Sequence, residues 1–238
     1  MNVVILQPFY LPYGGVFELV RMADVVVFYD DVKVSRQDWQ SRNRIKTSSG
    51  TQWLVVPLLG SNEATVREAA VNDDEPWRRK HRTAVEQAYA KAPHRDLVLD
   101  ALGPFWLQSW ANLADLDIAT FTRLCELMDV DAQFVRSSEL GVPGRASQRV
   151  LDICRSLGAT RYISGPAART YLDEPSFASA GIELCYHRFD HPRYRQLHGE
   201  FVPDLSVVDL LANEGPDAGS IVRGSGEAVP AGEFEGAS

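Results

Sequence analysis

Cysteine is scarce in this chain of 238 residues, which contains only Cys125, Cys154 and Cys185. No two of them form a C-x-x-C pair, and each stands in an apolar context, so we expect buried reduced thiols, with a nucleophile as the alternative. No apolar run approaches the roughly 18 residues of a transmembrane helix, and the N-terminus shows no signal-peptide pattern. These absences predict a cytoplasmic protein without a membrane partner.

Positive charge is also in the minority, with 24 Lys and Arg against 32 Asp and Glu and a net charge of -8. A general nucleic-acid binder needs a basic face, so nucleic acid is not an expected partner. The chain has no Walker loop, G-x-G-x-x-G, H-E-x-x-H or G-x-S-x-G motif. We therefore expect no cofactor and no metal site.

Apolar residues make up 45% of the chain, which is ample for a core. Residues 3–6 and 25–29 read as short buried strands with a helix at 16–22 between them, and such a βαβ unit predicts a parallel sheet. Further strands are expected at 53–57, 133–135, 162–163 and 182–186. Further helices are expected at 75–92, 96–102, 113–128, 148–157 and 207–213. The expected fold is α/β, with a mostly parallel sheet flanked by helices and a helical middle segment.

The domain prediction is a single α/β domain over residues 1–215 with a helical insertion at about 75–128. From Pro216 onward, Gly, Ala, Ser, Glu and Pro replace the large apolar residues. A segment of this composition buries little surface, so 216–238 is predicted to be a disordered tail.

Polar residues follow the first two strands, where an open α/β sheet binds its ligands. Gln7 begins a loop that contains Tyr13 and Gly14 and ends at the expected helix, so it could bind a ligand or be a tight packed turn. Asp30 and Asp31 follow the second strand. They could bind a metal or amine, act as a general base, or form a solvated turn.

A basic segment comes next, with Arg36, Trp39, Arg42, Asn43 and Arg44. Arginine forks bind phosphate or carboxylate in a bidentate manner, so an anionic substrate is the favoured interpretation. A surface network of salt bridges is the alternative.

His81 lies on the apolar face of an expected helix and is either a packed core residue or an acid–base group. His187, His191 and His198 lack metal-site spacing, and a loop in which Tyr194 and Gln196 line a pocket is the better interpretation. Ser164 follows a strand and either binds phosphate or caps a helix.

Taken together, the segments QPFYLPYGGVFEL, MADVVVFYDDV, WQSRNRI, WRRKHRTAVEQAYAKAP and SQRVLDICRSLGATRYISGP resemble the WbqC-like protein family. The resemblance implies a role in the biosynthesis of cell-surface polysaccharide such as O-antigen, of modified sugars or of natural products. Carried over by position, it implies matching polar residues at Gln7, Tyr13, Asp30, Asp31, Arg42, Asn43, Arg44, His81, Tyr89, Ser164, Tyr171, Tyr194, Gln196 and Asp209. Of these, Asp30, Asp31 and His81 are our candidate catalytic residues. The others except Asp209, together with Gly14 of the first loop, are our candidate substrate-binding residues.

The order of strand, loop and helix is also similar to nucleotidyltransferases of the HIGH-signature superfamily, although the HIGH histidines are missing at residues 13–16. Our primary hypothesis is acyl or aminoacyl transfer to an amine on an amino-sugar-type substrate. The expected partner is an anionic small molecule, either a nucleotide sugar or an activated acyl donor. A carrier protein or partner enzyme is an additional candidate partner. Adenylyl transfer and a non-catalytic sugar-nucleotide-binding role are the alternatives.

Overall fold

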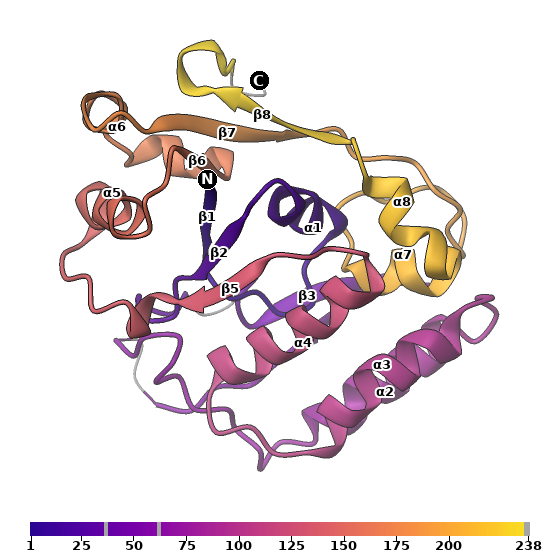
Figure 1. Ribbon diagram of the computed structural model, residues 1–238. Coiled ribbons are helices and arrows are strands. Elements are labelled where there is room, and N and C mark those ends of the chain that lie inside the picture. Colours follow the sequence, from indigo (N-terminus) through magenta and orange to yellow (C-terminus); the bar gives the residue numbers. More distant parts are fainter. Residues whose placement is uncertain (36–37, 61–62, 236–238) are drawn as a thin grey trace.

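The computed structural model describes residues 1–35, 38–60 and 63–235 and contains a six-stranded sheet in the order β5-β2-β1-β6-β7-β8 (Figure 1). The first five strands in this order pair in parallel, and β8 joins the edge antiparallel to β7. This confirms the predicted α/β class with a mostly parallel sheet. The strands of this sheet are β1 (Asn2–Leu6), β2 (Val25–Phe28), β5 (Gln133–Arg136), β6 (Arg161–Ser164), β7 (Glu183–Phe189) and β8 (Gly226–Pro230).

Alternation along the central strands explains why both faces of the sheet are covered. Val4 and Val26 belong to one buried cluster, and Val3 and Val25 belong to a second cluster on the opposite face. Helices therefore pack on both faces, as in other doubly wound folds. The α-helices are α1 (Gly14–Arg21), α2 (Trp77–Ala88), α3 (Arg95–Leu107), α4 (Leu113–Leu127), α5 (Ala146–Ser156), α6 (Glu174–Ser179), α7 (Val207–Glu214) and α8 (Ala218–Val222).

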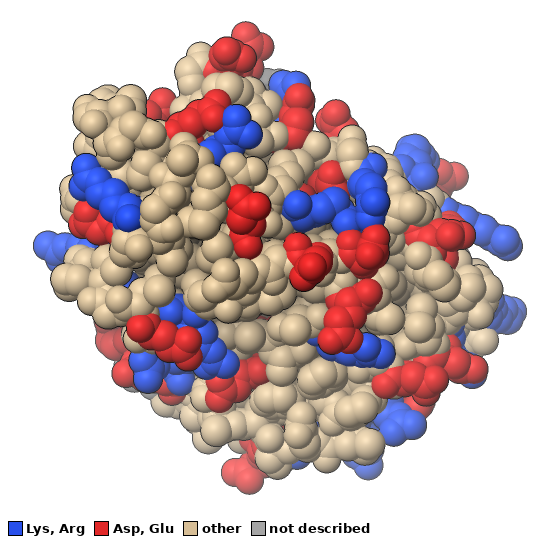
Figure 2. All heavy atoms as spheres, viewed as in Figure 1, with Lys and Arg blue, Asp and Glu red and all other residues tan. Residues whose placement is uncertain are grey.

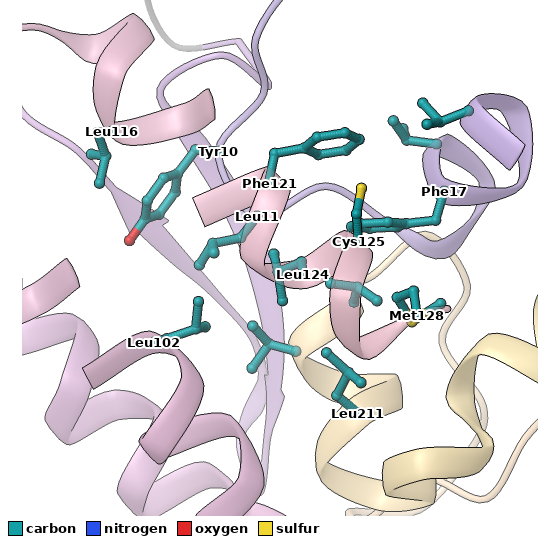
Figure 3. Close-up of a cluster of buried hydrophobic side chains, with 14 of the residues drawn as sticks. Tyr10, Leu11, Phe17, Leu102, Leu116, Phe121, Leu124, Cys125, Met128 and Leu211 are labelled. Atoms are coloured by element: carbon teal, nitrogen blue, oxygen red, sulfur yellow. The ribbon is translucent and has the colours of Figure 1, made fainter. Parts of the chain in front are cut away.

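The larger cluster lies between the sheet and the helices α1, α3, α4 and α7. Figure 3 shows Phe17, Phe121 and Leu211 converging there, and the Phe17 and Phe121 rings stack with centroids 5.1 Å apart. The predicted helical middle segment is present as α2, α3 and α4, of which α2 and α3 lie side by side (Figure 1).

The strand expected at 53–57 does not join the main sheet. It overlaps β4 (Gly50–Val55), which pairs antiparallel with β3 (Arg42–Thr47) in a separate two-stranded sheet. The basic segment therefore enters a hairpin, and its alternating residues Arg42 and Arg44 lie on one face of β3. Arg36 lies outside the described residues.

The prediction of a disordered tail is wrong for residues 216–235. Helix α8 follows directly on α7, and β8 pairs with β7 over Cys185 to Phe189. Val222, Val229 and Phe234 are buried although the segment contains few large apolar residues. Backbone pairing to an open sheet edge, which composition does not reveal, orders this segment.

None of the described helices has the length and apolar character needed to cross a membrane. On the face drawn in Figure 2, acidic and basic side chains are interspersed and form no extended patch of a single sign.

Candidate functional site

The topological switch point lies between β1 and β6. From β1 the chain builds outward through β2 to β5, and from β6 it builds in the other direction through β7. Loops at the carboxyl ends of two such strands diverge and leave a crevice, where doubly wound proteins bind ligands. A cleft of about 800 Å³ opens there, which we call the switch-point cleft. Its lining includes Gln7, Tyr13, Gly15, Tyr29, Lys33, Asp31, Arg145, Arg149, Ser164, Gly165, Tyr171 and His187.

Two further hollows adjoin this cleft. The Arg44 pocket, of about 280 Å³, is lined by Phe9, Pro12, Tyr13, Val16, Trp39, Asn43, Arg44 and Asp204. A hollow of about 890 Å³ beside β7 shares Tyr13 and His187 with the cleft and adds Arg169, Asp190 and His191. Because Tyr13 lines all three cavities, it stands at their junction.

Tyr13 is held by the close approach of α1. A Cβ added at Gly15 would lie 2.4 Å from the Tyr13 ring and 2.8 Å from Phe189, so only glycine lets the ring pack there. Burial, and then the charge of Asp204, raise the pKa of the Tyr13 hydroxyl. Gly14, predicted to bind substrate, instead contacts α8, where an added Cβ would lie 2.9 Å from Val222. Its role in the structure is packing.

Besides Tyr13, three of the predicted binding residues line the switch-point cleft. Gln7 accepts a hydrogen bond from Gln40 Nε2 at 2.5 Å, and its own Nε2 has no partner among the described residues. Ser164 is buried at the end of β6, where its Oγ accepts a hydrogen bond from Tyr162 at 3.2 Å. Tyr171 is half exposed at the rim. The structure thus brings Gln7, Ser164 and Tyr171 to the same cleft.

Asp31 also lines the cleft, but its carboxylate already accepts hydrogen bonds from the protein. Arg149 donates two hydrogen bonds to it, at 3.0 and 2.5 Å, and Ser137 donates a third at 2.5 Å. Partial burial alone would raise the pKa of Asp31, but the bonds from Arg149 and Ser137 outweigh it and the net shift is downward. An ionised, paired carboxylate is a poor proton acceptor, so Asp31 is better suited to orienting Arg149.

Asp30 is completely buried and lines none of these three cavities. Its carboxylate accepts hydrogen bonds from the Ser137 hydroxyl at 3.2 Å and from the Ser138 amide and hydroxyl at 3.1 and 2.9 Å. It therefore ties the loop after β2 to the loop after β5. This geometry contradicts the predicted catalytic role, because Asp30 cannot touch a ligand in the cleft.

The two hairpin arginines of the predicted anion site, Arg42 and Arg44, have different surroundings. The Arg42 guanidinium stacks over Trp53 at 4.2 Å and lines none of the three cavities, whereas Arg44 opens into its own pocket between Trp39 and Trp53, at 5.7 and 5.6 Å. Neither arginine has an ion pair among the described residues, and the Nε of each is buried without a partner. The alternative of a salt-bridge network is therefore not what the structure shows.

Asn43 lies between these two arginines but points to the opposite face of β3. Its Nδ2 donates to the carbonyls of Tyr10 and Leu11 at 3.3 and 2.8 Å. Leu11 has a φ of +46°, a left-handed conformation that is costly for a leucine. Asn43 thus stabilises the loop that places Gln7 and Tyr13, and it also lines the Arg44 pocket.

His81 is buried on α2, away from the cleft, with both ring nitrogens engaged. The Tyr10 hydroxyl donates to Nδ1 at 2.9 Å, and Nε2 donates to the Val55 carbonyl at 3.1 Å. The Tyr10 oxygen also accepts from Trp106 Nε1 at 3.1 Å, so the network is satisfied only by neutral His81. Burial lowers the pKa of His81 to about 4. The packed-core alternative is therefore the one the structure favours, and it contradicts the catalytic role.

Tyr89, Tyr194 and Gln196 are gathered in a second buried network outside the cleft. Both tyrosine hydroxyls donate to Asp209, at 2.9 and 2.8 Å. Gln196 bonds Tyr194 at 3.1 Å and accepts from Lys46 Nζ at 3.2 Å. This network fastens the chain between β7 and α7, so the predicted substrate-binding role of these three residues is replaced by a structural one.

The three C-terminal histidines do not converge. His198 Nε2 lies 2.7 Å from the Ala88 carbonyl, and His191 packs between Phe189 and Phe201. Among the described residues, no group of three His, Cys, Asp or Glu side chains is placed to hold a metal ion. His187 is different, because it lines the cleft and its Nε2 is buried without a partner. Burial lowers the pKa of His187 to about 4, so the ring is neutral at pH 7.

Sequence reasoning gave no site role to Tyr29, Arg145, Arg149 and His187 of the cleft, or to Asp204 of the Arg44 pocket. Tyr29 could have been found, because it ends a predicted strand at the ligand-binding edge. Arg149 lies on α5 and His187 on β7, whereas Arg145 and Asp204 lie in loops, and only the tertiary fold brings them to the site.

Fold and cleft together define an α/β protein of the doubly wound type with a cleft at its switch point. The model of the WbqC-like protein family matches residues 7–221, and the chain belongs to this family. It is 34% identical over 226 residues to the uncharacterized protein Rv1507c of Mycobacterium tuberculosis, covering 93% of this chain and 97% of that protein. No solved structure matches.

Proposed function

We propose that this protein forms amides, by transferring an acyl or aminoacyl group from an anionic activated donor to an amine on an amino-sugar-type substrate. One observation supports this most. The switch-point cleft adjoins, at Tyr13, a pocket that holds Arg44, an arginine with no ion pair among the described residues. Two reactants can therefore meet at Tyr13, with the negative charge of one of them neutralised by Arg44.

The donor side of the reaction is assigned to the Arg44 pocket. Trp39 and Trp53 flank the Arg44 guanidinium, and its Nε is buried, which strengthens its attraction for phosphate or carboxylate. Arg145, which has no ion pair among the described residues, lines the cleft and can hold a second anionic group, such as the phosphates of a nucleotide sugar. Gln7 and Ser164 offer hydrogen bonds to sugar hydroxyls.

The reaction runs by direct attack. The amine nitrogen attacks the donor carbonyl carbon, the new N–C bond forms, and the bond from that carbon to the leaving group breaks with its electrons departing on the leaving group. The amine proton passes to the departing leaving group or to solvent water, because the low pKa of His187, at about 4, makes its ring a weak base.

The cysteines support direct attack over a covalent intermediate. All three are buried, and burial raises the pKa of Cys125 and Cys154 to about 12 and that of Cys185 above its ordinary value. The thiolate is the nucleophilic form of cysteine, so a thioester on this chain is disfavoured at neutral pH.

The family resemblance supports placing this reaction in the cytoplasm, within the biosynthesis of cell-surface polysaccharides such as O-antigen, of modified sugars or of natural products. The donor is then a small activated acyl compound, or the acyl group carried by a partner protein. The sequence offered no cofactor fingerprint, and the proposed mechanism requires none.

Mass spectrometry tests the proposal directly. Purified protein is incubated with a panel of acyl phosphates, acyl adenylates and thioesters together with amino-sugar nucleotides, and amide products are sought. Product that depends on the protein, and falls at least tenfold in Arg44→Met, supports the proposal. Saturable binding of a sugar nucleotide with no product from any donor would instead identify a non-catalytic binding partner.

Adenylyl transfer is the second candidate. The strand order and the position of Ser164-Gly165 across the switch point from Gln7 favour it, because this placement suits a nucleotide. Pyrophosphate release from ATP that requires a carboxylate or sugar-phosphate substrate would establish adenylyl transfer and overturn amide formation from preactivated donors.

A further inference from the structure

The Arg44 pocket has two charges of opposite sign, and neither forms an ion pair with a described residue. Arg44 has no ion pair among the described residues and its Nε is buried without a hydrogen-bond partner. Asp204 lines the same pocket, is exposed, and likewise has no partner for its carboxylate in the described part of the chain. Because the two side chains do not pair with each other, space for a ligand remains between them.

The walls of the pocket are apolar and aromatic. Phe9, Val16 and Trp39 line it beside the charged pair, and Tyr13 closes the side toward the switch-point cleft. At about 280 Å³ the pocket lies just below the range of about 300–1,000 Å³ that is usual for drug-sized ligands. Its occupant is therefore a small molecule with an anionic group, a cationic group and an apolar part.

We propose that the Arg44 pocket is a subsite for an α-amino acid with an apolar or aromatic side chain, the aminoacyl part of the transferred group. Arg44 binds the carboxylate, or the anionic leaving group of the activated donor, and Asp204 binds the α-ammonium. This inference rests on the proposed transferase function and narrows the donor from any acyl compound to an aminoacyl one.

The location of the pocket fits this role. The bound α-carbon lies between the two charges, so the carbonyl carbon is turned toward Arg44 and the junction at Tyr13. An amine in the switch-point cleft reaches that carbon from the other side of Tyr13. A ligand with only one of the two charges leaves the opposite charge of the pocket without a partner, and binds less tightly.

Binding of free amino acids tests the subsite without requiring turnover. L-Phenylalanine is titrated into the full chain by calorimetry, beside 3-phenylpropanoate, which lacks the ammonium, and phenethylamine, which lacks the carboxylate. We expect saturable binding of L-phenylalanine and at least about tenfold weaker binding of each analogue. Equal affinity for 3-phenylpropanoate and L-phenylalanine, or no binding of L-phenylalanine, would overturn the proposal.

Variants assign the two contacts. Asp204→Asn should remove the preference for L-phenylalanine over 3-phenylpropanoate, and Arg44→Met the preference over phenethylamine. Arg79→Met on α2 and Asp100→Asn on α3 change the same side chains at exposed positions away from the pocket and should leave both preferences intact. A preference that survives Asp204→Asn unchanged would refute the assignment.

The two proposals can fail separately. Discrimination among the three ligands without amide formation from any donor leaves the amino-acid subsite standing and refutes the transferase. Amide formation at equal rates from donors with and without an α-amine supports the transferase and refutes the subsite.

Discussion

Protonation of His81 should destabilise the fold by an amount that the structure sets. Its ordinary pKa of 6.5 falls to about 4 in the folded chain because of burial. Protonation would make Nδ1 a second donor, while Tyr10 already donates to it and Nε2 already donates to Val55. The folded state therefore binds fewer protons than the unfolded chain between these two pKa values, and stability falls as the pH is lowered through this window.

The magnitude follows from linkage. With pKa values of 6.5 and about 4, His81 alone lowers the free energy of unfolding by about 2 kcal/mol at pH 5 and about 3 kcal/mol at pH 4, relative to pH 7. Other groups also titrate in this range, so the contribution is read as a difference between two proteins. The comparison is with His81→Gln, whose amide can accept from Tyr10 and donate to Val55 but does not titrate.

Urea denaturation at pH 7 and pH 5 measures this difference. The unsubstituted protein should lose about 2 kcal/mol more stability over that interval than His81→Gln loses. Equal losses in the two proteins would refute the assignment of His81 as a buried neutral hydrogen-bonding group. Loss of turnover in His81→Gln with unchanged ligand binding would return His81 to the catalytic role that the sequence suggested.

Three further predictions concern the site and its supports. Gly15→Ala should push Tyr13 from its position, lowering stability by about 1–3 kcal/mol and weakening ligand binding, as measured by denaturation and calorimetry. Arg149→Met removes two of the three side-chain hydrogen bonds to the carboxylate of Asp31, so the pKa of Asp31 should rise, which NMR titration of its carboxyl signal would detect. Tyr89→Phe removes one of two tyrosine bonds to a buried carboxylate and should cost about 1–3 kcal/mol in urea denaturation; no change would refute the network.

The sequence alone predicted the helices and strands whose own residue pattern determines their structure. Continuous β-branched runs predicted β1 and β2, and the apolar stripe of residues 113–128 predicted α4, which spans Leu113–Leu127. Strand β8 could not be predicted in this way, because its order comes from pairing with the edge of β7 and not from its own apolar residues. Strand β3 could not be predicted from its own residues either. Its alternating arginines, Arg42 and Arg44, pack against Trp53 and Trp39, and these contacts form only in the folded chain.

For the candidate site, position along a strand was informative and residue type was not. Gln7, Asp31 and Ser164 line the cleft because they follow strands that end at the switch point. His81 and Asp30 have side chains suited to acid–base chemistry, yet both are buried in satisfied hydrogen-bond networks. Whether a titratable side chain faces a cleft or the core depends on packing between elements distant in sequence, which one sequence does not display.

The most direct test of the central claim blocks the switch-point cleft without disturbing the fold. Gly165 lines the cleft, has a φ of -65°, and has no atom within 4 Å of an added Cβ, so Gly165→Phe can be accommodated and fills the cleft. Gly232, equally open but outside the three cavities around Tyr13, provides the control Gly232→Phe. We predict that amide formation measured by mass spectrometry is lost in Gly165→Phe and kept in Gly232→Phe. Full activity in a folded Gly165→Phe protein would contradict the account.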